Sequence, residues 1–181
     1  EKSTCSKGSV LVEDGIIKDV GNIKVSAETR MIKCEGLTIS VGFTDIHAHF
    51  REPGREDKEN LETGSFAAMA GGFTRVCVMP NTNPVLDSPE SIRYIIEKSE
   101  DLPVNIHPIG AITAGQKGVE LAEIGEMVKA GICAISDDGI PLKNGNLIRY
   151  ALEYSRIFDI PLINHAEDPD VRCDGQMNAG E

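Results

Sequence analysis

The sequence has no excess of basic residues and no cluster of them. It contains 18 Lys and Arg against 29 Asp and Glu, and its formal net charge at pH 7 is −11. A negative surface repels the phosphate groups of nucleic acids and of anionic lipids. We therefore expect neither a nucleic acid nor a membrane among its partners.

The chain also lacks an apolar run long enough to span a bilayer, and no signal-peptide pattern opens it. It has no C-x-x-C pair. Its cysteines are odd in number and scattered, at Cys5, Cys34, Cys77, Cys133 and Cys173. These features predict reduced thiols in a cytoplasmic protein.

The first forty residues read as a small β unit, distinct from the rest of the chain. The segment "SVLVEDGIIKDVGN" places two β-rich runs around Asp14-Gly15, which predicts a hairpin. The segment "RMIKCEGLTI" indicates a second pair of strands. We assign residues 1–40 to this unit.

From residue 41 onward, apolar strands alternate with helical patterns. The strands are expected over residues 41–47, 74–80, 104–110, 132–138 and 161–167, and the helices near residues 60–70, 89–99, 118–130 and 145–158. The strands are almost continuously apolar, as in a parallel sheet that is covered on both faces. The pattern predicts an α/β fold, either a doubly wound sheet or part of a (β/α)8 barrel of the TIM type.

The segment after the fifth strand, "EDPDVRCDGQMNAGE", is polar and is expected to be a loop. Five β-α units do not close an eight-fold barrel. We therefore interpret residues 41–181 as the first part of a barrel within a longer chain.

Polar residues gather at the C-terminal ends of the predicted strands, where active sites lie in both candidate folds. His47 and His49 end the first strand. Alternate residues of a strand face the same side, so these two imidazoles point together, and a divalent cation can take a lone pair from each. His165 offers a third imidazole from the fifth strand. With an aspartate from the fourth strand, the set suits zinc.

Some polar residues near these strand ends have a structural interpretation. Asp137 and Asp138 are adjacent and face opposite ways, so at most one of them points toward the histidines. His107 has no companion and is expected to be structural. Charges that we expect to be solvated in loops are Glu52, Glu56, Asp57, Glu167 and Asp168.

The segments "DIHAHFREPG", "MPNTNP", "SDDG" and "NHAED" resemble the signature segments of the dihydroorotase family, within the cyclic amidohydrolase superfamily. The H-x-H pair alone is shared across the superfamily, whereas its combination with R-E-P-G and M-P-N-T is specific. The resemblance runs from Val41 to the last residue. It implies the first part of a metal-dependent amidohydrolase barrel.

The resemblance implies a role for each matched residue. His47 and His49 would bind one zinc ion, His165 would bind a second, and Asp138 would bridge the two, because the family's ligand directly precedes the glycine of this motif. The implied substrate-binding residues are Arg51, Asn81 and His49. For Arg51 the alternative is a surface salt bridge with Glu52 or Glu56.

The implied reaction is the reversible hydrolysis of dihydroorotate to N-carbamoyl-L-aspartate, in de novo pyrimidine (UMP) biosynthesis. The family's general acid/base is an aspartate that would lie beyond Glu181, so no catalytic acid/base is expected within these 181 residues. We expect the segment alone to be inactive and poorly stable.

Two other functions stay open at the sequence level. One is another cyclic amidohydrolase, of the dihydropyrimidinase or allantoinase type, although residues 132–139 ("ICAISDDG") lack the bridging lysine of those enzymes. The other is an inactive dihydroorotase-like subunit that supports aspartate carbamoyltransferase. A homo-oligomer and an association with that enzyme are both compatible with the resemblance.

Overall fold

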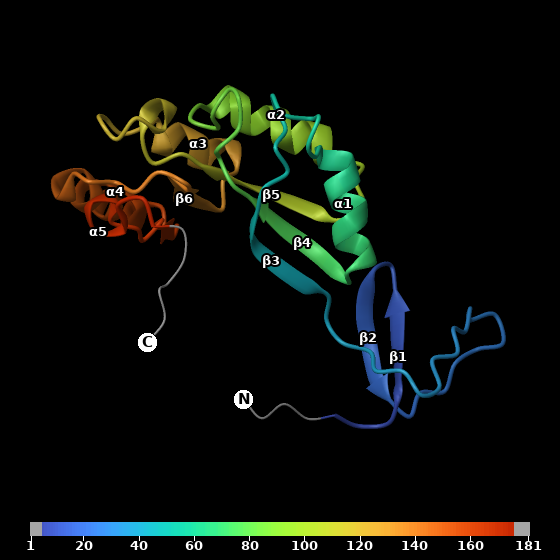
Figure 1. Ribbon diagram of the computed structural model, residues 1–181. Helices are drawn as coiled ribbons and strands as arrows, with labels where there is room; N and C mark the ends of the chain where they lie inside the picture. Colours follow the sequence, from blue (N-terminus) through green and yellow to red (C-terminus); the bar gives the residue numbers. More distant parts are fainter. Residues whose placement is uncertain (1–4, 176–181) are drawn as a thin grey trace. The chain divides into compact units, whose positions relative to one another are not determined.

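The alternating strands and helices form a parallel sheet in the computed structural model, which describes residues 5–175 (Figure 1). The chain divides between Ser40 and Val41 into two compact units. Within the described residues, no helix has the length and apolar character needed to cross a membrane.

The first unit contains an antiparallel hairpin of β1 (Ser9–Glu13) and β2 (Ile16–Gly21). Asp14 and Gly15 both have positive φ, of 50° and 74°, as a two-residue hairpin turn with the right twist requires. The predicted hairpin is therefore confirmed.

The second predicted strand pair in this unit is wrong, because residues 22–42 contain no strand. A strand requires a neighbouring strand to pair with, and residues 22–39 have none within the described residues. Met31, Ile32, Leu37 and Ile39 are each at least 60% exposed.

The second unit is built on a five-stranded parallel sheet with the order β3-β4-β5-β6-β7. Its strands are β3 (Phe43–Ala48), β4 (Phe73–Val78), β5 (Asn105–Gly110), β6 (Ala134–Ser136) and β7 (Leu162–Ile163). Each strand pairs with the next one in the sequence, and the sheet curls (Figure 1). A doubly wound sheet would reverse its strand order at a switch point, so this order is that of a barrel wall.

The connections between the strands are helical, as predicted, with two differences. The helices are α1 (Leu61–Ala70), α2 (Pro89–Ser99), the short 3-10 helix η1 (Ala114–Gln116), α3 (Ile124–Ala130), α4 (Gly145–Ile157) and α5 (Pro169–Arg172). Helix α3 begins six residues later than residue 118, because Leu121 forms a β-bridge with Thr113. The short helix α5 stands where a loop was expected, and the Asp168 carboxylate accepts from two of its backbone N–H groups.

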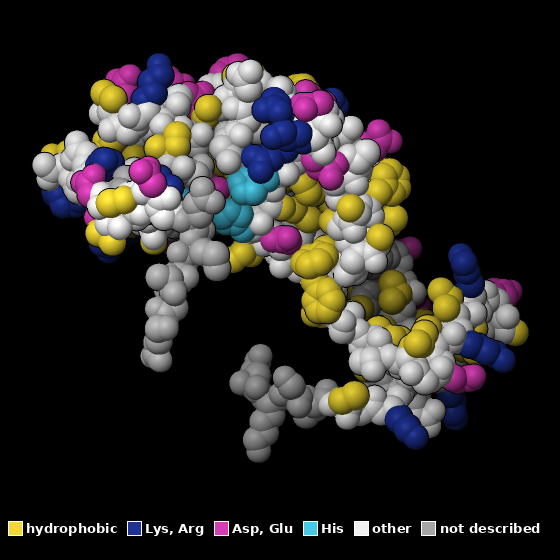
Figure 2. Space-filling model, viewed as in Figure 1, with side chains coloured by type: hydrophobic (Ala, Val, Ile, Leu, Met, Phe, Trp, Pro, Cys, Tyr) yellow, Lys and Arg dark blue, Asp and Glu magenta, His cyan; other side chains and the backbone are white. Residues whose placement is uncertain are grey.

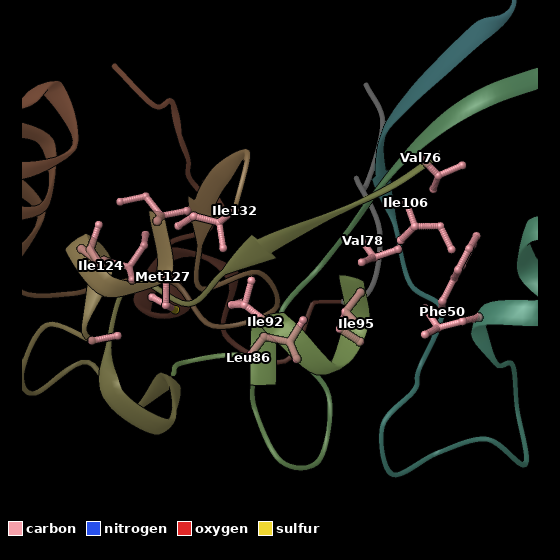
Figure 3. Close-up of a cluster of buried hydrophobic side chains, with 14 of the residues drawn as sticks. Phe50, Val76, Val78, Leu86, Ile92, Ile95, Ile106, Ile124, Met127 and Ile132 are labelled. Atoms are coloured by element: carbon pink, nitrogen blue, oxygen red, sulfur yellow. The ribbon is translucent and has the colours of Figure 1, made fainter. Parts of the chain in front are cut away.

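The main core lies between the sheet and helices α1 to α3. Val76 and Val78 of β4 pack there with Ile106 of β5, against Ile92 and Ile95 of α2 (Figure 3). The intervening residues face the other side, where Met79, Ile109 and Ala134 form a smaller buried cluster. This alternation along each strand determines which polar side chains reach the face that carries the site.

Candidate metal and carboxylate site

His47 and His49 point together from the end of β3, with their ring centroids 5.1 Å apart. Both face Asp138, which follows β6. His47 Nε2 lies 3.5 Å from Asp138 Oδ1, and His49 Nε2 lies 3.3 Å from Asp138 Oδ2. One ligand atom from each of the three residues lies within 4.8 Å of the others. Figure 2 shows histidine side chains gathered on one face of the surface.

His165, in the segment after β7, approaches the same carboxylate. Its Nδ1 lies 3.3 Å from Asp138 Oδ1, so the Asp138 carboxylate contacts all three imidazoles. Its Nε2 lies 3.1 Å from Glu167 Oε2, and Glu167 also pairs with Arg172. Glu167 was expected to be a solvated loop charge and is instead an ion-paired neighbour of His165.

Asp137 and Asp138 both follow β6, and Asp137 faces away from the histidines, so only one of the two aspartates points toward them, as predicted. Its Oδ1 accepts from Ile112 N at 2.8 Å and from Thr113 N at 3.1 Å, and its Oδ2 accepts from the Thr113 hydroxyl. Burial raises the pKa of Asp137, although these hydrogen bonds oppose the rise. Asp137 therefore fixes the segment after β5, and Asp138 alone of the two faces the histidines.

Asn81 lies beside His49. Its Oδ1 is 2.9 Å from His49 Nδ1. If Nε2 of His49 gives its lone pair to a cation, the ring proton must sit on Nδ1, which then donates to Asn81 Oδ1. From the sequence, Asn81 was expected to bind the substrate. Its contact with His49, a candidate metal ligand, was not predicted.

Arg51 occupies the turn directly after β3, with a left-handed φ of 59°. Among residues 5–175 it forms no ion pair, so the alternative of a salt bridge with Glu52 or Glu56 is wrong. Glu56 instead accepts from Gly54 N, and Arg55 pairs with Asp57.

The turn that carries Arg51 is locked to the loop that carries Asn81. Asn83 N donates to Pro53 O at 2.9 Å. Gly54 has a φ of 97°, and a Cβ added to it would lie 2.0 Å from Asn83 O. Glycine is therefore required at this position by both the backbone conformation and the close approach of the second loop.

The expectation that Glu52 is a solvated charge is wrong. It is only 3% exposed. Its carboxylate accepts from the Leu61 backbone N–H and from the side chains of Tyr94 and Lys98. Burial alone would raise the pKa of Glu52, but these donors and the positive charge of Lys98 outweigh it, and the pKa is lowered.

The converging groups fit a divalent transition-metal cation. Three imidazole nitrogens and a carboxylate are the donors that zinc takes in proteins. Asp138 has only 9% of its side chain exposed, and no Lys or Arg pairs with it in the described part of the chain. A metal cation would be the positively charged partner of this carboxylate.

The chain matches known proteins over most of its length. The family model described as "Dihydro-orotase-like" matches residues 36–181. A dihydroorotase of Acetivibrio thermocellus is 50% identical over 172 residues, which are 94% of this chain and 40% of that protein. A dihydroorotase of Syntrophotalea carbinolica is 46% identical over 175 residues, 96% of this chain and 41% of that protein. The chain thus spans about 40% of the length of these curated relatives.

A solved structure gives the fold independently. The L-hydantoinase (dihydropyrimidinase) of Arthrobacter aurescens superposes with a TM-score of 0.71 at 18% sequence identity, and the match covers 93% of this chain and 41% of that one. Together with the strand order, this match confirms the fold as part of a TIM-type barrel. With the family model covering all but the first 35 residues, the chain belongs to the dihydroorotase-like family.

Proposed function

We propose that this chain carries the metal-binding and carboxylate-binding part of a zinc-dependent dihydroorotase. The enzyme would interconvert dihydroorotate and N-carbamoyl-L-aspartate in cytoplasmic de novo pyrimidine biosynthesis. The observation that carries the proposal is the position of Asp138, whose carboxylate lies within 3.5 Å of an imidazole nitrogen of His47, His49 and His165.

These four residues would hold one or two zinc ions. His47 and His49 would hold one ion, His165 would hold a second, and the Asp138 carboxylate would serve both. Bound zinc supplies a water of lowered pKa and polarises a carbonyl oxygen. With its proton on Nδ1, His49 would donate to Asn81 Oδ1 and keep the lone pair of Nε2 available to the cation.

Arg51 and Asn81 would hold the carboxylate of dihydroorotate, with His49 beside them. A guanidinium gives a charge-assisted and bidentate grip on a carboxylate. Because Asn81 Oδ1 is used by His49, its Nδ2 amide is left to donate to the substrate. The contact of Asn83 with Pro53 holds the two loops in a fixed relation, which orients the ring before reaction.

The same proposal assigns the remaining role and partners. The general acid/base is an aspartate outside these 181 residues, as in the family. The substrate is a small molecule. The protein would act as a homo-oligomer or in association with aspartate carbamoyltransferase.

The test is a substrate comparison on the longest chain that the gene encodes and on the 181-residue segment. Dihydroorotate is compared with dihydrouracil, which has the same ring without the carboxylate. We expect the long chain to hydrolyse dihydroorotate, and the segment to show no turnover. Arg51→Ala should raise KM for dihydroorotate at least about tenfold, since a charge-assisted pair is lost.

Two outcomes would contradict the proposal. Turnover of dihydrouracil but not of dihydroorotate would assign another cyclic amide as substrate. Bound metal without turnover of either compound would favour an inactive supporting subunit. The matched control is Glu97→Ala, which removes an exposed carboxylate from α2 and should leave both kinetic constants unchanged.

A further inference from the structure

A buried carboxylate lies next in sequence to the proposed substrate-binding arginine. Glu52 follows Arg51 and is 3% exposed, whereas the side chain of its partner Lys98 is 51% exposed. Glu52 Oε2 accepts from Leu61 N at 2.8 Å, and Oε1 accepts from the Tyr94 hydroxyl at 3.0 Å and from Lys98 Nζ. Each carboxylate oxygen therefore has a donor, and the side chain is fixed.

The donors to Glu52 come from two helices of the main core. Leu61 is the first residue of α1, whose N-terminal N–H groups favour a negative charge. Tyr94 and Lys98 lie one turn apart on α2. The turn after β3 is thus tied to both helices through a single side chain.

The opposite side of this turn is tied to the Asn81 loop. Asn83 N donates to Pro53 O, and Gly54 allows the two backbones to approach closely. Directly before these ties in the sequence, Arg51 has a φ of 59°, a left-handed conformation that is unfavourable for a residue with a Cβ. Such a conformation persists where the surroundings hold it. Both neighbours of Arg51 are buried: Phe50 packs in the main core, and Glu52 is bound by the donors on α1 and α2.

We propose that Glu52 is a positioning residue that holds Arg51 for the substrate carboxylate. The inference rests on the proposed function, since it gives Arg51 the role described there. The ion pair with Lys98 does not by itself explain the choice of glutamate at a buried position, because an apolar side chain of similar size commonly stabilises a core equally well. A fixed carboxylate with donors from two directions specifies one conformation of the turn.

A double-mutant cycle between positions 51 and 52 tests this inference. Wild type, Glu52→Ala, Arg51→Ala and the double variant are compared in the longest chain that the gene encodes. Displacement of a positioned group by about 1 Å costs up to about 100-fold, so we expect Glu52→Ala to raise KM for dihydroorotate about tenfold. We expect kcat to change by less than about threefold, and the double variant to have the KM of Arg51→Ala.

A merely structural role would give a different pattern. If the two substitutions raise KM by independent factors, or if Glu52→Ala leaves KM unchanged, the inference is overturned. Absence of dihydroorotate turnover in wild type would instead overturn the proposed function, so the two failures are distinguishable. Glu97→Ala on α2 is the matched control and should match wild type.

A second variant covers the case in which Glu52→Ala does not fold. Glu52→Gln keeps an oxygen that accepts from Leu61 N but loses the charge that pairs with Lys98. We expect it to fold, with a KM between those of wild type and Arg51→Ala. A folded Glu52→Gln whose effect on KM persists in full in the Arg51→Ala background would overturn the inference.

Discussion

Replacing Asn81 separates two roles that the structure combines in one side chain. Asn81→Ala removes the acceptor for the Nδ1 proton of His49, 2.9 Å away. Loss of such a partner typically weakens metal binding 10- to 100-fold, or about 1.4 to 2.8 kcal/mol. The His49 side chain is 27% exposed, so water can partly replace the lost acceptor. We therefore expect the lower end of the range, about tenfold.

Asn81→Asp should have the opposite effect on the metal. The carboxylate still accepts from His49, and a charged acceptor strengthens the bond, so zinc affinity should be equal to or above that of wild type. The added charge repels the carboxylate of dihydroorotate, and KM should rise at least about tenfold. The assay is zinc competition with a chelator of known affinity, together with KM, on the longest encoded chain.

Two outcomes would contradict the orienting role of Asn81. Unchanged zinc affinity in Asn81→Ala would refute the orienting role of this side chain. Equal losses of zinc affinity in the Ala and Asp variants would also refute it, because only one of them lacks the oxygen. Asp101→Asn is the matched control, since Asp101 is exposed and has no side-chain partner in the described residues.

Three further predictions concern stability, measured by urea unfolding of the longest encoded chain. Gly54→Ala should lower the free energy of unfolding by at least about 2 kcal/mol, because Gly54 has a positive φ and an added Cβ would lie 2.0 Å from Asn83 O. The control is Gly145→Ala, where an added Cβ meets no atom within 4 Å; it should lower the free energy of unfolding little or not at all. Asp137→Ala should lower it by about 2 to 4 kcal/mol, because two buried backbone N–H groups lose their acceptor; a loss below about 0.5 kcal/mol would contradict this. The pKa of Glu52 is lowered on folding, so its stabilising effect is present above the unfolded-state pKa of about 4.3 and is lost as the pH falls through the folded-state pKa. The difference in the free energy of unfolding between wild type and Glu52→Gln should therefore shrink below about pH 4. A difference that persists unchanged below that pH would contradict this prediction.

The arrangement of the histidines follows from properties that are local in the sequence. The period of two along a strand places His47 and His49 on one side, and parallel strands bring their C-terminal ends to one edge. For the same reason, Asp138 approaches the pair and His165 approaches Asp138. The alternation of strand residues also separated Asp137 from Asp138, although it did not say which one faces inward.

The burial of Glu52 could not be predicted from its neighbours in the sequence. A glutamate beside proline and glycine in a polar loop has the pattern of a solvated charge. Its partners Tyr94 and Lys98 lie 42 and 46 residues away, on a helix that reaches it only after the sheet has formed. The partners of Asp137 are likewise 24 and 25 residues away.

The wrong strand pair in residues 22–42 has a related cause. β propensity describes how well a side chain fits a pleated and half-buried surface, and it says nothing about whether a partner strand is present. The late start of α3 has a similar origin, because the β-bridge between Thr113 and Leu121 competes with the first helical turn.

Metal content is the most direct test of the site's central claim, that Asp138 and the three histidines form a zinc site. Elemental analysis is made on the purified longest chain as wild type, Asp138→Asn and the control Asp101→Asn. We predict about one to two zinc ions per chain in wild type and in the control, and less than about half of that in Asp138→Asn, which loses an anionic ligand. A wild-type protein without metal, or an Asp138→Asn variant with the full content, would contradict the account.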